Sequence, residues 1–142
     1  MSADHDPPAV GDVWSYPYLW ARQARGGETE GRKTRPCALI LLLRQDDGRT
    51  LVVLLAITTQ RPLPGQAAVE VPQIERRRAG LDVDRPLWVI VDERNEDVLP
   101  GSYDFEPGGR IGRFGAAFTG QLRRAKMEAI RSRRSRRVPR QE

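Results

Sequence analysis

At 142 residues the chain is long enough for one domain with its own apolar core, and its single cysteine, Cys37, excludes a disulfide framework. The formal net charge is +5, but residues 131–142 hold six arginines and one glutamate, so the other 130 residues carry 18 cations and 18 anions. Any anion site in the folded part must therefore come from local clustering. No apolar run approaches the roughly 20 residues that span a bilayer, so we expect no membrane segment and a reducing cytoplasm as the compartment.

The first third of the chain predicts a leader, a strand and a long connection. Residues 1–10 are polar and contain prolines, so we expect a flexible leader. Residues 11–16, GDVWSY, alternate enough for a short first strand. Residues 17–34 form a stretch longer than the roughly 12–15 residues usual for loops in compact domains. Such a stretch is typical of a lid or a binding loop, and a disordered insertion is the alternative.

Two apolar strands follow, at 36–43 and 51–57, and the Asp47-Gly48 pair between them is a strong hairpin signal. Neither strand alternates apolar and polar residues, so each must be covered on both faces. In a chain of this size the second cover is a helix or another subunit. The pattern is thus a first indication of a homodimer.

The remaining elements are short, apart from one helix. We expect a Pro-rich loop at 60–66, a strand at 67–71, a helical turn at 73–79 ended by Gly80, a strand at 86–92 and a turn-rich segment at 100–112. From about residue 113, apolar residues three and four apart predict a helix, namely Phe114, Phe118, Leu122, Ala125 and Ala129. Together these elements predict a mainly β fold, a small, partly open barrel at 11–130 capped by a C-terminal helix. Residues 131–142 are expected to be a disordered arginine-rich tail.

The sequence excludes several catalytic centres from the domain. His5 is the only histidine and lies in the leader, which excludes a Ser-His-Asp or Cys-His arrangement. One cysteine and one histidine cannot form a zinc site, so we expect neither a metal ion nor a cofactor. Arg110 and Arg113 precede the helix and can hold an anion there, although a turn that packs closely on the helix is the favoured alternative.

A cationic cluster directly precedes the first apolar strand. Arg32, Lys33 and Arg35 lie in the segment EGRKTRPCALILLL at 30–43. A solvated strand edge is the ordinary interpretation, and a phosphate-binding mouth is the other. In a hairpin the start of one strand lies beside the end of the next, so we expect Arg35 beside Thr58. A guanidinium and a hydroxyl placed together can grip a phosphate group and stabilise charge that develops on it.

These segments, in this order, resemble the MazF/PemK (Kid) toxins of bacterial toxin–antitoxin pairs. The resemblance covers about residues 11–130, and its segments are GDVWSY at 11–16, RP at 35–36, TTQ at 58–60, GLDVDRPLWVIVDE at 80–93 and the closing helix. It implies an SH3-like (CcdB/PemK-type) barrel, usually a homodimer, that is neutralised by an antitoxin protein. It also implies metal-independent cleavage of single-stranded RNA, in which the ribose 2′-OH attacks the adjacent phosphate and leaves a 2′,3′-cyclic phosphate and a 5′-OH.

The resemblance also implies roles for individual residues. Arg35 takes the position of the catalytic arginine and Thr58 that of the paired threonine. Since arginine stays protonated in proteins, Arg35 is an electrostatic stabiliser, with proton donor as a second role, and Glu30 or Asp92 is the candidate general base. The family members that use the aspartate at the position of Asp92 carry an arginine where this chain has Ile90. The residues expected to contact RNA are Arg32, Lys33, Thr59, Gln60 and Trp20.

Some alternatives stay open at this stage. Trp20 either stacks on unpaired bases or covers the mouth of the barrel. The domain is either a nuclease or a non-catalytic RNA-binding or regulatory module on the same barrel. A poison of DNA gyrase, as in the CcdB toxins, is disfavoured because Arg35-Pro36 and Thr58-Thr59 fit the nuclease pattern.

Overall fold

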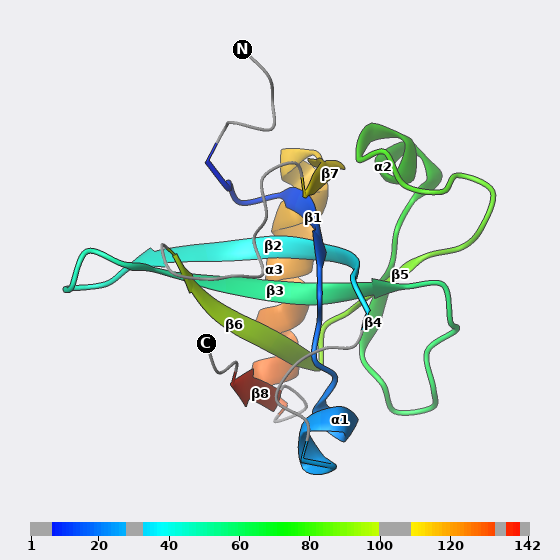
Figure 1. Ribbon diagram of the computed structural model, residues 1–142. Coiled ribbons are helices and arrows are strands. Elements are labelled where there is room, and N and C mark those ends of the chain that lie inside the picture. Colours follow the sequence, from blue (N-terminus) through cyan, green and yellow to red (C-terminus); the bar gives the residue numbers. More distant parts are fainter. Residues whose placement is uncertain (1–6, 28–32, 100–108, 133–135, 140–142) are drawn as a thin grey trace.

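The computed structural model describes residues 7–27, 33–99, 109–132 and 136–139 and is mainly β, with a C-terminal helix (Figure 1). The strands are β1 (Asp12–Tyr16), β2 (Arg35–Arg44), β3 (Thr50–Thr58), β4 (Ala68–Glu70), β5 (Trp88–Ile90), β6 (Glu93–Leu99), β7 (Arg110–Arg113) and β8 (Arg136–Pro139). The helices are α1 (Ala21–Arg25), α2 (Gln73–Arg78) and α3 (Ala116–Arg131). The predicted mainly β fold with a C-terminal helix is confirmed.

The sheet is built around the antiparallel pair β2 and β3. β1 pairs with the other edge of β2, and β7 pairs with β1. The outer edge of β3 is shared, because β6 pairs with its first half and β5 with its last two residues. All of these pairs are antiparallel, as is the pair of β4 and β5, and the described strands leave the sheet open rather than closed into a barrel.

The predicted hairpin of β2 and β3 is present. Residues 45–49 connect the two strands, and Gly48 has a φ of +83°, which suits the turn. The pairing runs from Arg44 opposite Thr50 to Cys37 opposite Ala56, with one irregularity between Leu39 and Leu41. The turn projects from the body of the molecule at the end away from β4 and β5 (Figure 1).

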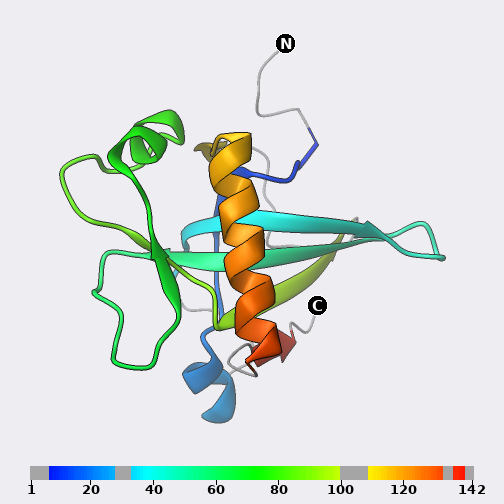
Figure 2. The same ribbon diagram turned by 180° about the vertical axis from the view of Figure 1, so that it is seen from behind.

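Both faces of β2 and β3 are covered within the one chain. α3 runs across one face (Figure 2), where Phe118 and Leu122 pack with Val53. Aromatic side chains of β1 and the segment after it cover the other face, where Leu39 and Leu54 are fully buried. These aromatic residues are Trp14, Tyr16, Tyr18 and Trp20. Most of the apolar residues of β2 and β3 are therefore covered without a second subunit, whereas Leu43 near the end of β2 is exposed.

Three strands, β6, β7 and β8, were not predicted from the sequence. The sequence of β6, ERNEDVL, lacks an apolar alternation, because buried polar side chains take the inward positions. The Asn95 side chain accepts from the backbone N–H of Leu19 and donates to its carbonyl, both at 2.8 Å. The Tyr16 hydroxyl donates to the Asp97 carboxylate at 2.6 Å. Buried hydrogen bonds thus replace apolar contacts and fix residues 16–19 to β6.

Other expectations hold in part. The segment predicted as a continuous loop at 17–34 contains the helix α1. α2 and the positive φ of Gly80 match the predicted helical turn, and residues 60–67 contain no helix or strand. Residues 136–139 of the tail form β8, parallel to β6, where the sequence predicts no regular structure. No helix in the described ranges is both long and apolar enough to cross a membrane.

Candidate functional site

Arg35 and Thr58 lie next to each other at the edge where β2 begins and β3 ends. Cys37 pairs with Ala56, so continuing this register by two residues brings Arg35 opposite Thr58. On its other side Arg35 pairs with Tyr16 of β1. The proximity expected from the hairpin is therefore present, while the chemical roles of the two side chains stay predictions.

A cavity of about 350 Å³, here called the Arg35 pocket, opens at this edge. Five of the site residues predicted from the sequence line it, namely Arg35, Thr58, Thr59, Gln60 and Trp20. Arg22 and Arg61 add two guanidinium groups that the sequence analysis did not single out. Lys33 is exposed and lines neither this cavity nor the next one described, and Glu30 and Arg32 fall outside the described residues.

Trp20 contacts two of the arginines in this pocket. The guanidinium carbon of Arg35 lies 5.1 Å from the centre of a Trp20 ring, and that of Arg22 lies 5.2 Å away. Cations at this distance are attracted to the π-system. Trp20 is only 6% exposed, so most of its ring surface is covered in this arrangement. In this arrangement Trp20 gathers two positive charges, and its role in stacking on unpaired bases stays a prediction.

Two buried N–H donors at the pocket lack a hydrogen-bond partner among the described residues. They are Nε of Arg35 and Nε1 of Trp20. A buried donor without an acceptor is costly, and functional sites are one place where such groups persist. An anionic ligand that supplies oxygen acceptors would remove this cost for the guanidinium.

The Thr58 hydroxyl accepts a hydrogen bond from the backbone N–H of Gln60 at 3.0 Å. This contact shapes the chain as it leaves β3. A hydroxyl that accepts one bond can still donate its own hydrogen. Thr58 is therefore able to donate to an anion bound beside Arg35.

A second cavity, of about 480 Å³, adjoins the first and is here called the Asp92 pocket. The two cavities share four lining residues, namely Trp20, Arg22, Leu63 and Gln66. Asp92 lines the second cavity and not the first, and its Oδ2 accepts from the backbone N–H of Ala67 at 3.2 Å. The structure therefore does not bring Asp92 into the same cavity as Thr58.

Glu93 is a further carboxylate of the Asp92 pocket that the sequence analysis missed. Burial raises the pKa of its carboxyl, the hydrogen bond from the Ala21 N–H at 3.0 Å opposes that shift, and the neighbouring Asp92 charge adds to it. Burial also raises the pKa of the nearby Tyr18 hydroxyl well above its ordinary value. Glu93 thus tethers the first turn of α1, which carries Arg22.

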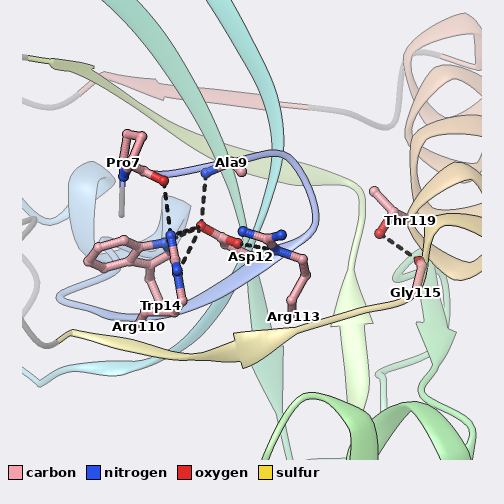
Figure 3. Close-up of polar contacts among 8 residues, drawn as sticks. All are labelled: Pro7, Ala9, Asp12, Trp14, Arg110, Arg113, Gly115 and Thr119. Atoms are coloured by element: carbon pink, nitrogen blue, oxygen red, sulfur yellow. Dashed lines mark hydrogen bonds and ion pairs between the residues drawn. The ribbon is translucent and has the colours of Figure 1, made fainter. Parts of the chain in front are cut away.

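Arg110 and Arg113, for which an anion site ahead of the helix was the less favoured interpretation, bind the buried carboxylate of Asp12 (Figure 3). Arg110 Nη2 lies 3.1 Å from one carboxylate oxygen of Asp12, and Arg113 Nε lies 2.7 Å from the other. The Trp14 indole N–H and the Ala9 backbone N–H also donate to this carboxylate. The cluster joins β1 to β7 and is structural.

Neither a search against protein-family models nor a search of curated proteins found a match for this chain. Among the described residues, no three histidine, cysteine, aspartate or glutamate side chains gather where they would hold a metal ion. The functional argument therefore depends on the geometry of the Arg35 and Asp92 pockets.

Proposed function

We propose that this chain is a cytoplasmic, metal-independent endoribonuclease of the MazF/PemK type, built on an SH3-like barrel, that cleaves single-stranded RNA. The observation that carries the proposal is the Arg35 pocket, in which Arg35 and Thr58 lie with two more guanidinium groups. A guanidinium and a hydroxyl donor around one cavity suit a phosphodiester, which is anionic and rich in acceptors.

In this mechanism the ribose 2′-oxygen forms a bond to phosphorus while the bond from phosphorus to the 5′-oxygen breaks. The 2′-hydroxyl proton goes to a general base, and the departing 5′-oxygen takes a proton from Arg35 or from solvent water and so becomes a hydroxyl. Arg35 stabilises the negative charge that grows on the phosphoryl oxygens, and the Thr58 hydroxyl donates to one of them. Asp92 in the adjoining pocket and Glu30 remain the proposed candidates for the general base that takes the 2′-hydroxyl proton.

Arg22 offers a substitute for the arginine that the family pattern has at the position of Ile90. Ile90 lines the Arg35 pocket, at the position where the family members that use the aspartate carry an arginine. Arg22 lines the same pocket and is held against Trp20. A second guanidinium is therefore supplied from α1 instead of β5, which supports a working phosphate site.

A specific observation favours a second candidate, an RNA-binding or regulatory module without catalysis. No carboxylate or histidine is among the described residues that line the Arg35 pocket. A phosphate can be bound there without a group that removes the 2′-hydroxyl proton.

One experiment separates the two candidates. A long single-stranded RNA is incubated with the protein in EDTA, and the ends of any fragments are analysed. Fragments with 2′,3′-cyclic phosphate and 5′-OH ends support the nuclease. Intact RNA together with binding that requires Arg35 supports the module, and intact RNA without binding contradicts both.

The proposal includes two protein partners, a cognate antitoxin and a second copy of the chain. Leu43, Met127 and Ile130 are exposed beside an apolar cavity of about 340 Å³ between α3 and the sheet. We predict a homodimer whose interface buries at least about 1,200 Å² in total. Sedimentation should show the dimer at micromolar concentrations, and Met127→Asp should weaken it if this surface takes part. Monomer alone at tens of micromolar would contradict the prediction.

The arginine-rich tail leads to another prediction. β8 pairs with β6 and contacts α1, so the tail backbone passes close to the Asp92 pocket. We expect deletion of residues 131–142 to weaken RNA binding at low salt without moving the cleavage positions. Each lost phosphate contact should flatten the plot of log affinity against log salt by about 0.7.

The control for this deletion is a full-length chain in which the six tail arginines are glutamine. It should reproduce the flattened slope, since the effect depends on charge. An unchanged affinity and slope in both variants would show that the tail is inert, and altered cleavage positions would show that it belongs to the RNA groove.

A further inference from the structure

The Asp92 pocket has the size and the position of a nucleotide subsite. Its volume of about 480 Å³ lies within the range of small-molecule sites, which is about 300–1,000 Å³. It shares Trp20 and Arg22 with the Arg35 pocket, so the two cavities adjoin. An RNA strand whose phosphate lies beside Arg35 would therefore place a neighbouring nucleotide in the Asp92 pocket.

Three kinds of lining match the faces of a base, the edge of that base and the phosphates that flank it. Leu63 and Pro64 provide apolar walls for the faces of a base. Arg22 and Arg25, both on α1, provide positive charge for the phosphates that flank it. Two carboxylates, of Asp92 and Glu93, are acceptors for the N–H groups at a base edge. In a site that binds only a phosphate group, these carboxylates would repel the anion.

Asp92 has capacity for a ligand, whereas Glu93 is engaged in the fold. One oxygen of Asp92, Oδ2, accepts from the Ala67 N–H at 3.2 Å, and the described residues donate no hydrogen bond to the other oxygen. Asp92 is also only partly buried, so its carboxylate is accessible from the cavity. Glu93 Oε1 accepts from the first backbone N–H of α1.

We propose that the Asp92 pocket binds the base next to the cleaved phosphate and that Asp92 selects guanine there. The proposal rests on the proposed RNA function, and it leaves Glu30 as the candidate for the general base. Guanine presents two adjacent donors, N1–H and the N2 amino group, which match the two oxygens of one carboxylate. Adenine and cytosine each place a ring acceptor beside their single amino donor, and uracil places its one N–H between two carbonyls. A carboxylate therefore accepts two bonds from guanine and meets a repelling lone pair on each of the others.

The test uses binding rather than cleavage. Uridine heptamers with 2′-fluoro sugars cannot attack their own phosphates, and they carry uracil, adenine, cytosine, guanine or hypoxanthine at the central position. Fluorescence anisotropy gives their dissociation constants with wild type, Arg35→Ala, Asp92→Asn and Asp46→Asn. Asparagine at position 92 keeps an oxygen for the Ala67 N–H but replaces the other oxygen with a donor. Asp46 lies exposed in the β2–β3 turn and controls for the loss of one negative charge.

We expect the guanine heptamer to bind wild type about tenfold tighter than the others, because one good bidentate base contact discriminates by roughly that factor. Hypoxanthine, which lacks the N2 amino group, should lose most of this advantage. Asp92→Asn should abolish the guanine preference and leave the all-uridine heptamer within about twofold, since only the base contact changes. Asp46→Asn should behave as wild type.

The outcomes also separate this inference from the proposed function. Equal binding of all bases, or a guanine preference that survives Asp92→Asn, overturns the guanine site while Arg35-dependent binding upholds the RNA function. If none of the heptamers binds, or if Arg35→Ala leaves their binding unchanged, the proposed RNA site is itself overturned and the subsite with it.

Discussion

Replacement of Arg35 by alanine should lower the rate of RNA cleavage by about 10²–10³, which is the usual loss when one preorganised partner of transition-state charge is removed. The fold should survive the change. Arg35 is only partly buried and forms no ion pair with any described residue, so its loss leaves no carboxylate unpaired. The substitution also removes a buried Nε that has no acceptor in the described part of the chain.

The measurement is the single-turnover cleavage rate in EDTA, together with the thermal midpoint as a test of folding. Arg35→Lys should restore only part of the rate, because an ammonium group keeps the charge but lacks the planar fork that grips two phosphate oxygens. Arg49→Ala is the matched control, since Arg49 is exposed and pairs only distantly with Asp47 (4.0 Å) in the turn at the other end of the hairpin. Wild-type cleavage by a folded Arg35→Ala protein would remove Arg35 from the mechanism.

The parts of the fold that the sequence predicts are those with strong local signals. The Asp-Gly pair and two apolar runs define the β2–β3 hairpin, and this hairpin alone brings Arg35 to Thr58. In α3, apolar residues three and four apart define the buried face, with Phe118 and Leu122 in the core. The proximity of Arg35 and Thr58 therefore follows from the sequence, because it depends on one local strand pairing.

The remaining parts of the candidate site, which include Arg22 and Asp92, depend on contacts between distant segments. β6 is held by Asn95 and Asp97, whose buried hydrogen bonds give no apolar period for a sequence pattern to detect. α1 has five residues, too few for a periodic signal, and the Ala21 N–H in its first turn is bound by Glu93, 72 positions along the chain. Arg22 reaches the Arg35 pocket only because of this tertiary contact, so its place was not predictable.

The separation of Asp92 from Thr58 has the same origin. Asp92 lies between β5 and β6, two strands that share the outer edge of β3. The path of the chain from β5 to β6 determines which cavity Asp92 lines. The sequences of the two strands do not predict that path. The expectation of a dimer from β2 and β3 loses its basis for a related reason, because two of the four aromatic side chains that cover the second face, Tyr18 and Trp20, come from a segment predicted as a loop.

Asp12 is a position where a single substitution should cost much of the stability. Its side chain is fully buried, and it accepts hydrogen bonds from the guanidinium groups of Arg110 and Arg113 (Figure 3). Removing one partner of a buried ion pair leaves an uncompensated charge and costs about 3–5 kcal/mol. The Arg110 side chain is only 9% exposed, so water cannot replace the carboxylate, whereas the 53% exposed Arg113 side chain can be hydrated. We therefore expect Asp12→Ala to lower the free energy of unfolding by about 3–5 kcal/mol.

Urea denaturation of wild type, Asp12→Ala and Arg113→Ala would measure this difference. Arg113→Ala should cost much less, on the order of 1 kcal/mol, because Arg113 is half exposed and Arg110 still neutralises Asp12. A second substitution, Arg110→Met in the Asp12→Ala background, should recover part of the loss, since it removes the charge that the first one left buried. If Asp12→Ala costs no more than Arg113→Ala, the cluster does not hold β7 on β1. In that case the contact would contribute no more than an exposed ion pair, and the close packing of Gly112 against the Ala79 carbonyl would have to hold β7 in place.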